Sequence, residues 1–377
     1  MTSKPLILQD FEPYLKKKVP GTWWEYFQRG ADAQQTLADN VLAFQKYRLR
    51  PRCLRDVSKR DLSTTILGHR LDFPVGVCPT AFQGMVHPEG DVAMAKGVAS
   101  VGSAMALSIY SSNDLEDVTA PLSSEIPLFQ QLNVFCDRQT LERTVEYTKH
   151  IIKRAEKAGL KGIVLTVDQP VRGRRLAEPI FIPPYIKCPL ISLPNDPHFH
   201  SKNLSFDASM TWDDIEWLRS MTSLPIILKG ILTAEDAKEA VRRGASAIWV
   251  SNHGGRQLDG VSASIDALPE VVDAVRGSDI EVYLDGGIRQ GTDVLKALAL
   301  GARAVFIGRP ALWGLAYDVG LTITLSLCKH VLEQGAAGVT QVLEILRDEL
   351  SRAMALSGCA SVADITSDLV KMPSHGV

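Results

Sequence analysis

The 377-residue chain lacks an excess of charge of either sign. Its 41 lysines and arginines face 43 aspartates and glutamates, which leaves a formal net charge of −2 and excludes broad attraction to nucleic acid or to an anionic membrane. The strongest basic cluster, at residues 16–18, is typical of a solvated helix face. No stretch approaches the roughly 20 apolar residues of a membrane span, and the first residues lack the apolar segment of a secretory signal. We therefore expect a protein that stays in the cell and binds neither nucleic acid nor membrane.

Cysteine is also scarce. The six cysteines are scattered along the chain, with no C-x-x-C pair and no nearby histidine pair in metal-binding register. This pattern favours reduced thiols in a cytosolic or organelle-matrix protein, and it gives no reason to expect a metal site.

What is present favours a large folded core. The chain is 45% hydrophobic and 22% charged, which fits one large α/β barrel or two smaller domains. At four helix-to-strand junctions a glycine is followed by a short apolar strand that ends on a small or polar residue; these glycines are Gly102, Gly159, Gly244 and Gly301. The repeated alternation predicts a parallel sheet with helices outside it.

Eight apolar segments between residues 74 and 310 are candidate strands. They are 75–79, 103–108, 128–133, 162–167, 225–230, 247–252, 281–285 and 304–308. Helical stretches separate them, so eight units fit a closed (β/α)₈ TIM barrel better than an open doubly wound sheet.

We therefore predict a single domain over residues 1–377. It consists of an N-terminal helical cover (1–72), a barrel core (73–310) and C-terminal helices (311–377). The proline-rich segment 172–212 is predicted to form a long lid loop after the fourth strand, because loops of this length usually cover or line a site.

A polar or otherwise distinctive residue follows each candidate strand. These residues are Thr80, Ser108, Gln131 with Asn133, Thr166 with Asp168, Lys229, Ser251 with His253, Asp285 and Arg309. In a barrel the strand ends share one rim, so the eight segments together would build one pocket. Polar residues also mark strand ends without any function, but a lysine directly after an Ile-Ile-Leu run favours the pocket.

Two glycine-containing segments, 285–289 and 308–310, follow the seventh and eighth strands, the usual phosphate site of this fold. Glycines let backbone N–H groups approach an anion, and Arg289 and Arg309 can fork onto phosphate oxygens. The glycines alone are weak evidence because tight turns need them anyway. Their position after these strands predicts a phosphorylated ligand.

Three further side chains carry candidate chemistry. Burial of an unpaired ammonium is costly, so Lys229 is predicted to face an anionic or electron-rich partner, with a Schiff-base lysine as the rival interpretation. His253 and Arg256 lie three residues apart, where a histidine can remove a proton and a guanidinium can pair with a carboxylate. Asp168 could orient the imidazole and stabilise its protonated form. Without its neighbours, His253 would more often be structural than catalytic.

Five segments make the chain resemble the FMN-dependent α-hydroxy-acid oxidase family from about residue 8 to 370. They are His-Pro-Glu-Gly at 87–90, Ser-Asn-His-Gly-Gly-Arg-Gln-Leu-Asp at 251–259, Leu-Asp-Gly-Gly-Ile-Arg at 284–289, Ala-Leu-Ala-Leu-Gly-Ala at 297–302 and Phe-Ile-Gly-Arg-Pro at 306–310. The resemblance implies a (β/α)₈ barrel that holds FMN at its C-terminal rim and oxidises a 2-hydroxy acid to a 2-oxo acid.

The resemblance also implies residue roles. His253 looks like the active-site base, Asp168 like its partner, and Tyr26 and Arg256 like contacts of the substrate carboxylate, with Arg175 as a second arginine near the substrate. The implied FMN contacts are Pro79, Thr80, Ala81, Ser108, Gln131 and Thr166 at the ring, Lys229 against negative charge on the reduced ring, and Ser251, Asp285, Gly286, Gly287, Arg289, Gly308 and Arg309 at the ribityl and phosphate groups. Whether His253 takes the α-proton or the hydroxyl proton stays open.

Several departures from the family pattern bear on the substrate. Asn133 stands where the family usually has a tyrosine, which leaves a shorter hydrogen-bonding side chain beside the substrate. Tyr110 stands where short-chain members carry tryptophan, which indicates a changed pocket wall and a larger substrate. The lid lacks the family's charged Asp-x-Arg-Asn stretch, and residues 318–334 look like an insertion between two helices.

Three functions remain as hypotheses. The first is an oxidase that passes electrons to O₂ and forms hydrogen peroxide. The second is a dehydrogenase of the same fold that reduces a quinone or a cytochrome, and the third is a flavin-binding relative that has lost turnover. The full set of His253, Arg256, Asp168, Tyr26 and Lys229 argues against the third.

The resemblance further implies a homo-oligomer, commonly a tetramer. A peroxisomal or cytoplasmic location is expected, although residues 374–377, Ser-His-Gly-Val, are not a peroxisomal tripeptide of the Ser-Lys-Leu kind.

Overall fold

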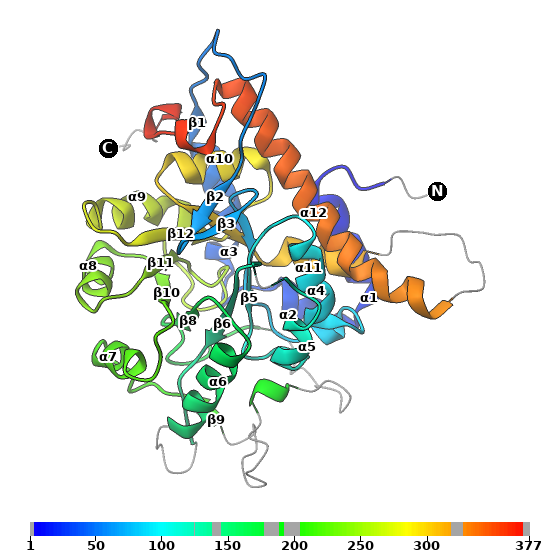
Figure 1. Ribbon diagram of the computed structural model, residues 1–377, viewed down its shortest axis with the longest axis vertical. Coiled ribbons are helices and arrows are strands. Elements are labelled where there is room, and N and C mark those ends of the chain that lie inside the picture. The colour runs from blue at the N-terminus through cyan, green and yellow to red at the C-terminus, as the bar shows by residue number, and fades with distance from the viewer. Residues whose placement is uncertain are drawn as a thin grey trace.

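A computed structural model describes residues 4–123, 125–137, 145–176, 188–191, 204–317 and 327–371. Eight parallel strands close into a barrel in the order β10-β11-β12-β13-β4-β5-β6-β8 (Figure 1). The strands are β4 (Val75–Val77), β5 (Met105–Leu107), β6 (Leu128–Leu132), β8 (Ile163–Thr166), β10 (Ile226–Ile231), β11 (Ala247–Val250), β12 (Glu281–Asp285) and β13 (Ala304–Ile307). Each overlaps one predicted segment, so the predicted TIM barrel is confirmed.

The barrel interior is packed with side chains from alternate strand positions. Phe129, Trp249 and Phe306 belong to this inner cluster, and the ring centroids of Trp249 and Phe306 lie 4.0 Å apart. Gly76 is required beside them, because a Cβ there would lie 2.5 Å from the ring of Phe306. The strands are buried on both faces, which explains their nearly continuous apolar sequence.

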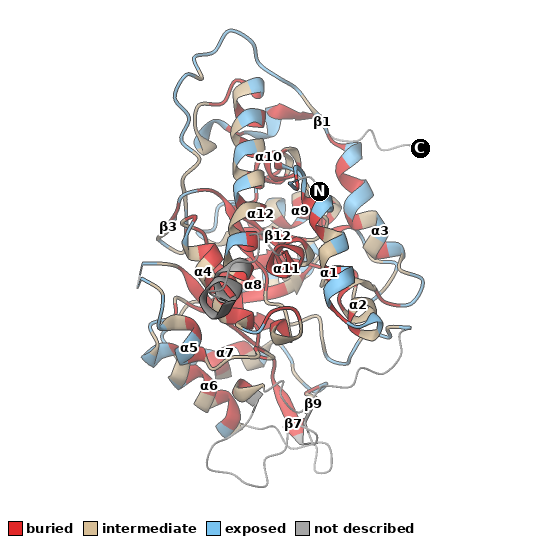
Figure 2. Ribbon diagram, turned by 90° about the vertical axis from the view of Figure 1, so that its right-hand side faces the viewer, coloured by how far each residue is buried: buried red, intermediate tan, exposed pale blue. Residues whose placement is uncertain are grey.

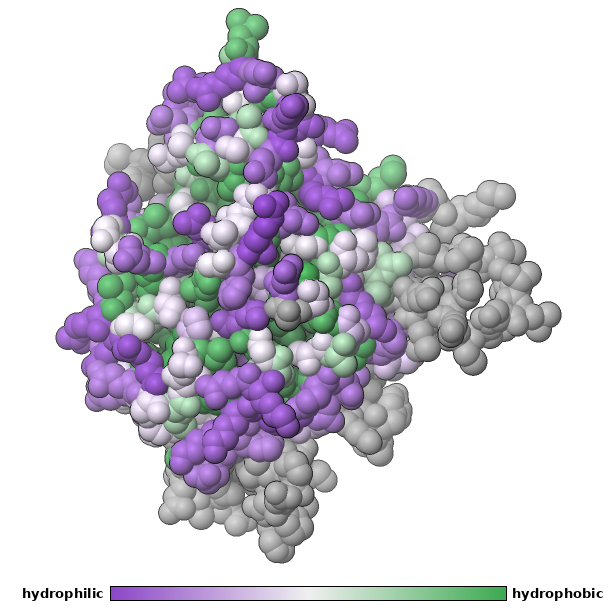
Figure 3. Space-filling view, viewed as in Figure 1, coloured by the Kyte–Doolittle hydropathy of each residue, from purple (hydrophilic) through white to green (hydrophobic). Residues whose placement is uncertain are grey.

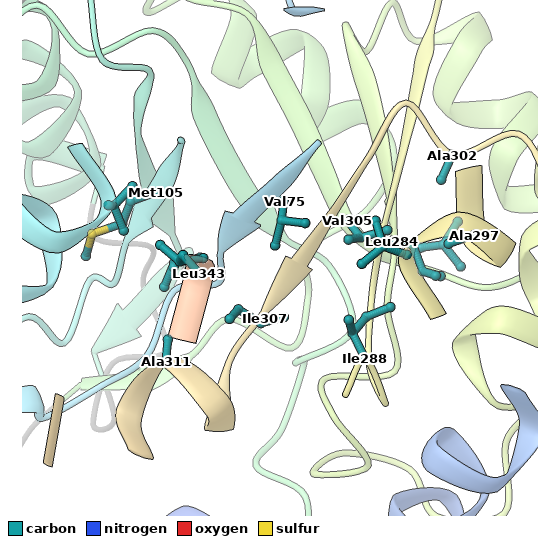
Figure 4. Close-up of a cluster of buried hydrophobic side chains, with 14 of the residues drawn as sticks. Val75, Met105, Leu284, Ile288, Ala297, Ala302, Val305, Ile307, Ala311 and Leu343 are labelled. Carbon is teal, nitrogen blue, oxygen red and sulfur yellow. The ribbon is translucent and has the colours of Figure 1, made fainter. Parts of the chain in front are cut away.

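The intervening strand residues point outward against the surrounding helices. This outer layer contains Val75, Met105, Leu284, Val305 and Ile307 from the strands and Ala297, Ala311 and Leu343 from the helices (Figure 4). Because successive Cβ atoms alternate between the two faces, a polar residue two positions beyond an inward-facing residue also points inward. Lys229 follows the inward-facing Ile227 in this way, and Ser251 follows Trp249. The period of the strands therefore places polar side chains directly above the packed interior.

Nine helices surround the barrel in the described part of the chain. They are α4 (Gly90–Ala99), α5 (Leu115–Thr119), α6 (Val145–Lys157), α7 (Asp213–Arg219), α8 (Ala234–Arg242), α9 (Ser264–Ala274), α10 (Gly291–Ala299), α11 (Arg309–Ala316) and α12 (Leu327–Ser357). In α8, Ala237 and Ala240 are buried, and the side chain of Thr233 caps the helix by accepting from the N–H of Asp236 at 3.3 Å. Helix α12 is buried on one side and exposed on the other, whereas α11 has no exposed residue (Figure 2).

The longest helix, α12, lies against α4, α10 and α11 (Figure 1). Glycines permit these close crossings: a Cβ at Gly97 would lie 2.6 Å from the carbonyl oxygen of Ala336, and one at Gly338 would clash with the carbonyl oxygen of Gly314. Of the predicted insertion at 318–334, residues 318–326 lie outside the described residues and the remainder begins α12.

The N-terminal cover is helical only in its first part. It contains η1 (Leu8–Phe11), α1 (Glu12–Lys18), α2 (Gly21–Gln28), α3 (Gln35–Leu42) and η2 (Ala43–Lys46), and then turns to the short strands β1 (Arg48–Leu49), β2 (Thr64–Ile66) and β3 (His69–Leu71). Residues 48–71 therefore differ from the predicted helical cover. The β-branched residues of β2 favour extended backbone, and Leu67 and Gly68, with φ of 46° and 80°, close a hairpin with β3. Strand β1 pairs with β14 (Val370–Lys371) and so joins the two ends of the fold.

The predicted lid begins directly after β8. Its described parts are residues 172–176, 188–191 with η4 (Pro189–Ile191), and 204–212 with β9 (Leu204–Phe206), and β9 pairs antiparallel with β7 (Phe135–Asp137). Residues 177–187 and 192–203 of the predicted lid lie outside the described residues.

Hydrophilic side chains cover much of the face seen in Figure 3. Among the described helices, none has the length and apolar composition that a membrane span requires.

Candidate active site

One cavity opens at the carboxyl ends of the barrel strands, and residues in or just after each of the eight strands line its wall. Its volume is about 1300 Å³, counted together with the space that is open to solvent. The predicted convergence of the strand ends on one pocket is thus found in the structure.

Almost all the predicted site residues line this cavity. They are Tyr26, Pro79, Thr80, Ala81, Ser108, Tyr110, Gln131, Asn133, Thr166, Arg175, Lys229, His253, Arg256, Asp285, Gly286, Gly287, Arg289, Gly308 and Arg309. Asp168 and Ser251 are not part of the wall. Each instead hydrogen-bonds to residues that are, so both act from behind the cavity surface.

Lys229 is held inside the barrel mouth by a built-in counter-charge. Its Nζ donates to Oγ of Ser251 at 2.9 Å and lies 3.2 Å from Oδ2 of Asp285, and the hydroxyl of Ser251 donates to Oδ1 of Asp285 at 2.8 Å. Burial acts to lower the pKa of Lys229, but the carboxylates of Asp285 and Asp168 outweigh it and the pKa is raised. The lysine is therefore a fixed positive charge at neutral pH, which disfavours the Schiff-base interpretation.

His253 faces the cavity with a carboxylate behind it. Its Nδ1 lies 3.1 Å from Oδ1 of Asp168, so Nε2 is the nitrogen left for a ligand. Burial acts to raise the pKa of Asp168, but the charge of His253, its hydrogen bond and the charge of Lys229 lower the pKa overall, and the carboxylate stays ionised. Gly230 permits this arrangement, because a Cβ there would lie 2.6 Å from Cβ of Asp168.

The backbone of His253 is left-handed, with φ of 59°, which is unusual for a residue other than glycine. Gly254 and Gly255 continue the left-handed turn with φ of 62° and 72°, and the hydroxyl of Ser251 accepts from the N–H of His253 at 3.0 Å. A strained turn held by its neighbours is typical of functional sites. The turn brings His253 and Arg256 to the same cavity.

Tyr26 of α2 lies among arginines. The guanidinium carbons of Arg256 and Arg175 lie 5.0 Å and 5.5 Å from the centroid of its ring. Burial and the charges of Arg256 and Arg172 lower the pKa of Arg175 to about 10, although Tyr26 acts in the opposite direction. Both arginines remain cationic at neutral pH, so this end of the cavity attracts an anion.

Arg289 and Arg309 form the second cationic region, beyond β12 and β13. Burial lowers the pKa of both groups, and the charges of Arg256 and Arg289 lower that of Arg309 further. Arg309 donates to the carbonyl oxygens of Phe27 and Gly254, each at 3.1 Å. Among the described residues neither guanidinium forms an ion pair with a carboxylate.

In the predicted phosphate-binding segment 285–289, the two glycines allow the loop to pack closely on α3. Gly286 and Gly287 have φ of 98° and 83°, and a Cβ at Gly287 would clash with the carbonyl oxygen of Asn40. Gly254 instead faces a guanidinium, because a Cβ there would lie 3.0 Å from Nη1 of Arg309. A side chain at position 254 would therefore press on the guanidinium of Arg309.

Several supporting residues were not predicted. Asn40 and Asn252 exchange two amide hydrogen bonds of 2.8 Å, which tie α3 to the turn that carries His253. Gln257 donates to the carbonyl oxygens of Asp168 and Val171, both at 2.9 Å, and so fixes the start of the lid. Gln169 and Arg172 also line the cavity and were missed. The only available signal was that Asn252 and Gln257 flank His253 in the same polar segment.

Comparison with known proteins agrees with this geometry. A family model described as FMN-dependent dehydrogenase matches residues 15–372. The chain is 43% identical to 2-hydroxyacid oxidase 1 of Homo sapiens over 98% of each chain, and 43% identical to glycolate oxidase of Spinacia oleracea over 95% of this chain and 94% of that one. The chain belongs to the FMN-dependent dehydrogenase family. The resemblance seen in the sequence is thereby confirmed.

A solved structure has the same fold as this chain. Mandelate oxidase with (S)-2-phenylpropionate superposes with a TM-score of 0.81 at 36% identity, and the match covers 98% of both chains. The likeness therefore extends through the whole barrel as well as the short motifs.

The residues of the site fit the cofactor of the family. Arg289 and Arg309 are guanidinium groups without carboxylate partners among the described residues, as a phosphate group requires. Lys229 supplies a fixed positive charge in the barrel mouth, and amide and hydroxyl groups from β5, β6 and β8 line the wall beside it. In the described residues no cluster of three or more metal-ligating side chains is present.

Proposed function

We propose that the protein oxidises an L-2-hydroxy acid to a 2-oxo acid and passes the electrons to O₂, which forms hydrogen peroxide. The observation that carries the proposal is the His253–Asp168 pair beside Arg256 at one cavity that also contains the cationic phosphate region and Lys229. The substrate loses two electrons and two protons as its carbinol becomes a carbonyl. O₂ gains two electrons and two protons and so becomes hydrogen peroxide. Human 2-hydroxyacid oxidase 1 and the L-lactate oxidase of Nostoc, 43% identical to this chain, carry such reactions in their names.

In this proposal the side chains have separate tasks. Arg256 and Tyr26 bind the substrate carboxylate, with Arg175 beside them, because a guanidinium can form two parallel hydrogen bonds with it. Nε2 of His253 accepts one proton from the substrate, and the carboxylate of Asp168 stabilises the imidazolium that results. The α-proton and the hydroxyl proton both remain possible sources of that proton.

FMN, when bound, supplies the two-electron acceptor that can then react with O₂. Arg289, Arg309 and Gly308 would hold its phosphate, and Ser251, Asp285, Gly286 and Gly287 the ribityl end. Pro79, Thr80, Ala81, Ser108, Gln131 and Thr166 would contact its ring. Lys229 would oppose negative charge on that ring, a task suited to a lysine whose positive charge is already fixed by Asp285.

We further propose that the protein forms a homo-oligomer, namely a tetramer. We also propose that it is located in the peroxisome or the cytoplasm. Family membership supports both proposals. Light scattering coupled to size-exclusion chromatography tests the first, and a monomer mass would contradict it. Microscopy of the tagged chain against a peroxisomal marker decides between the two locations.

The experiment for the main proposal uses purified protein loaded with FMN. We expect yellow protein whose visible absorbance bleaches when glycolate, lactate, 2-hydroxyoctanoate or mandelate is added without oxygen. Under air, peroxide should form in step with substrate consumption. Dye reduction without peroxide would favour a quinone or cytochrome acceptor, and yellow protein that no hydroxy acid bleaches would favour the flavin-binding relative without turnover. Protein that takes up no FMN would refute the proposal.

A further inference from the structure

Two cavity side chains have no task in the proposed chemistry. Gln169 directly follows Asp168, Arg172 begins the predicted lid segment, and both side chains line the cavity. Neither belongs to the base, the carboxylate anchor or the phosphate region. Their surroundings indicate what kind of ligand group would satisfy them.

A backbone N–H fixes the direction of a row of three amides that ends at Gln169. The N–H of Ile109 donates to Oε1 of Gln131 at 3.0 Å, so the opposite end of that amide is Nε2, which donates to Oδ1 of Asn133 at 2.9 Å. Nδ2 of Asn133 then donates to Oε1 of Gln169 at 3.3 Å. Because a main-chain N–H can only donate, each amide in the row has one permitted orientation.

The row therefore ends on a donor. Nε2 of Gln169 has no acceptor among the described residues, and the side chain lines the cavity. Asn133, which stands where the family usually has tyrosine, is the link that passes this orientation on to Gln169. A ligand group opposite Gln169 must accept a hydrogen bond to satisfy it.

Arg172 adds a positive charge to the same wall. The neighbouring Arg174 is paired, with Nε 3.1 Å from Oδ1 of Asp32, but Arg172 and Arg175 have no carboxylate partner in the described part of the chain. Arg172, Arg175 and Arg256 thus face one cavity, and a substrate with a single carboxylate supplies one negative charge for all three. A second carboxylate would reduce their mutual repulsion.

We propose that the substrate is a 2-hydroxy dicarboxylate. Its first carboxylate binds Arg256 and Tyr26, and its far carboxylate binds Arg172 and accepts from Nε2 of Gln169. This inference rests on the proposed oxidation of a 2-hydroxy acid and names the substrate class within it. It also gives a chemical reason for Asn133 in place of an aromatic side chain.

The test compares mono- and dicarboxylates of equal chain length on the FMN-loaded enzyme. The pairs are lactate with tartronate, 2-hydroxybutyrate with malate, and 2-hydroxypentanoate with 2-hydroxyglutarate. We expect kcat/KM to favour the dicarboxylate about tenfold in at least one pair, the effect of one charge-assisted hydrogen bond. The preference should weaken as ionic strength rises, because Arg172 is exposed.

Arg172→Leu should remove the preference while the monocarboxylate is still oxidised. Arg174→Leu is the matched control, since it removes the same charge from the same loop but lies outside the cavity wall, and it should leave the preference unchanged. Equal or better use of the monocarboxylate in all three pairs would overturn the proposal. The same would follow if the two variants changed the preference equally.

A binding measurement separates this inference from the proposed function. Titration calorimetry of 2-oxoglutarate against 2-oxopentanoate needs no turnover, so it remains informative if no hydroxy acid bleaches the flavin. Tighter binding of the 2-oxo dicarboxylate that Arg172→Leu abolishes would support the second carboxylate site even then. Equal affinity of the two ligands in the wild type would overturn it, whatever the enzyme oxidises.

Discussion

Replacement of Asp168 by asparagine tests how the pair with His253 works. The pKa of Asp168 is lowered, because His253 and Lys229 together outweigh the effect of burial, so the wild-type carboxylate is ionised throughout the neutral range. Asp168→Asn therefore removes a full negative charge that lies 3.1 Å from Nδ1 of His253 and keeps a side chain of nearly the same shape. The change acts on the stability of the imidazolium after proton transfer.

The size of the effect follows from the geometry. The side chains of His253 and Asp168 are 28% and 13% exposed, so an effective dielectric constant near that of a protein surface applies. Two unit charges at about 4 Å then interact by about 4 kcal/mol, and a neutral amide retains part of this through its dipole. A loss of about 2–4 kcal/mol corresponds to about a thirtyfold to thousandfold slower reaction.

The assay is anaerobic stopped-flow reduction of the bound flavin at saturating hydroxy acid. Visible absorbance before mixing establishes that Asp168→Asn still holds FMN. Asp32→Asn is the matched control, because it also removes a carboxylate that contacts an arginine but neither pairs with His253 nor lines the cavity, and it should reduce flavin at the wild-type rate.

A double variant distinguishes a role through His253 from general damage. In a His253→Gln background, which by itself should slow reduction about 10²–10⁴-fold, Asp168→Asn should cost little more, because the group it supports is gone. Reduction by Asp168→Asn within threefold of the wild-type rate would refute the charge argument. Equal losses in both backgrounds would show that Asp168 does not act through His253.

Three further outcomes are expected. Lys229→Met should lower the affinity of the bound flavin for sulfite about tenfold or more, and unchanged affinity would remove Lys229 from the ring site. Gly287→Ala should unfold at a markedly lower temperature and lose FMN, because the added Cβ would clash with the carbonyl of Asn40. Gly260 also has a left-handed backbone but lies in open space, so Gly260→Ala should lower the free energy of unfolding by only about 1–2 kcal/mol. Burial raises the pKa of Asp91 from 3.8 to about 7, so the folded protein becomes less stable as the pH rises from about 4 to about 7. Asp91→Asn should reduce the fall in Tm over this pH range. Equal falls in Tm for the variant and the wild type would contradict the raised pKa of Asp91.

The barrel was predictable because its signal is local. A strand buried on both faces is a short apolar run, and eight such runs separated by helical stretches identify the barrel strands without reference to any distant residue. The polar position that follows each run is set by the same two-residue period, which is why Lys229, Ser251 and Asp285 could be placed at one rim from the sequence.

The remaining parts of the site depend on contacts between distant segments. Asn40 lies in the helical cover and Asn252 lies 212 residues later, and no periodicity relates them. Arg172 and Gln169 belong to an irregular segment in which the sequence does not indicate the direction of a side chain. The hairpin at 64–71 was missed because its strands are only three residues long and its signal is the turn at Leu67 and Gly68.

The cationic groups of the cavity differ in how their charge is compensated. Lys229 has its counter-ion within the protein, at 3.2 Å in Asp285, and both side chains are 5% exposed, so its position and charge are fixed before any ligand arrives. Arg256, Arg289 and Arg309 have carbonyl oxygens as hydrogen-bond partners and form no ion pair with a carboxylate among the described residues, so none of them has a counter-ion in direct contact. A preorganised charge suits stabilisation of negative charge that develops during a reaction, whereas uncompensated guanidinium groups suit binding of anions already present in the ground state. The pattern of ion pairs therefore supports the proposed division of roles, in which Lys229 would act on the reaction and the arginines would hold its reactants.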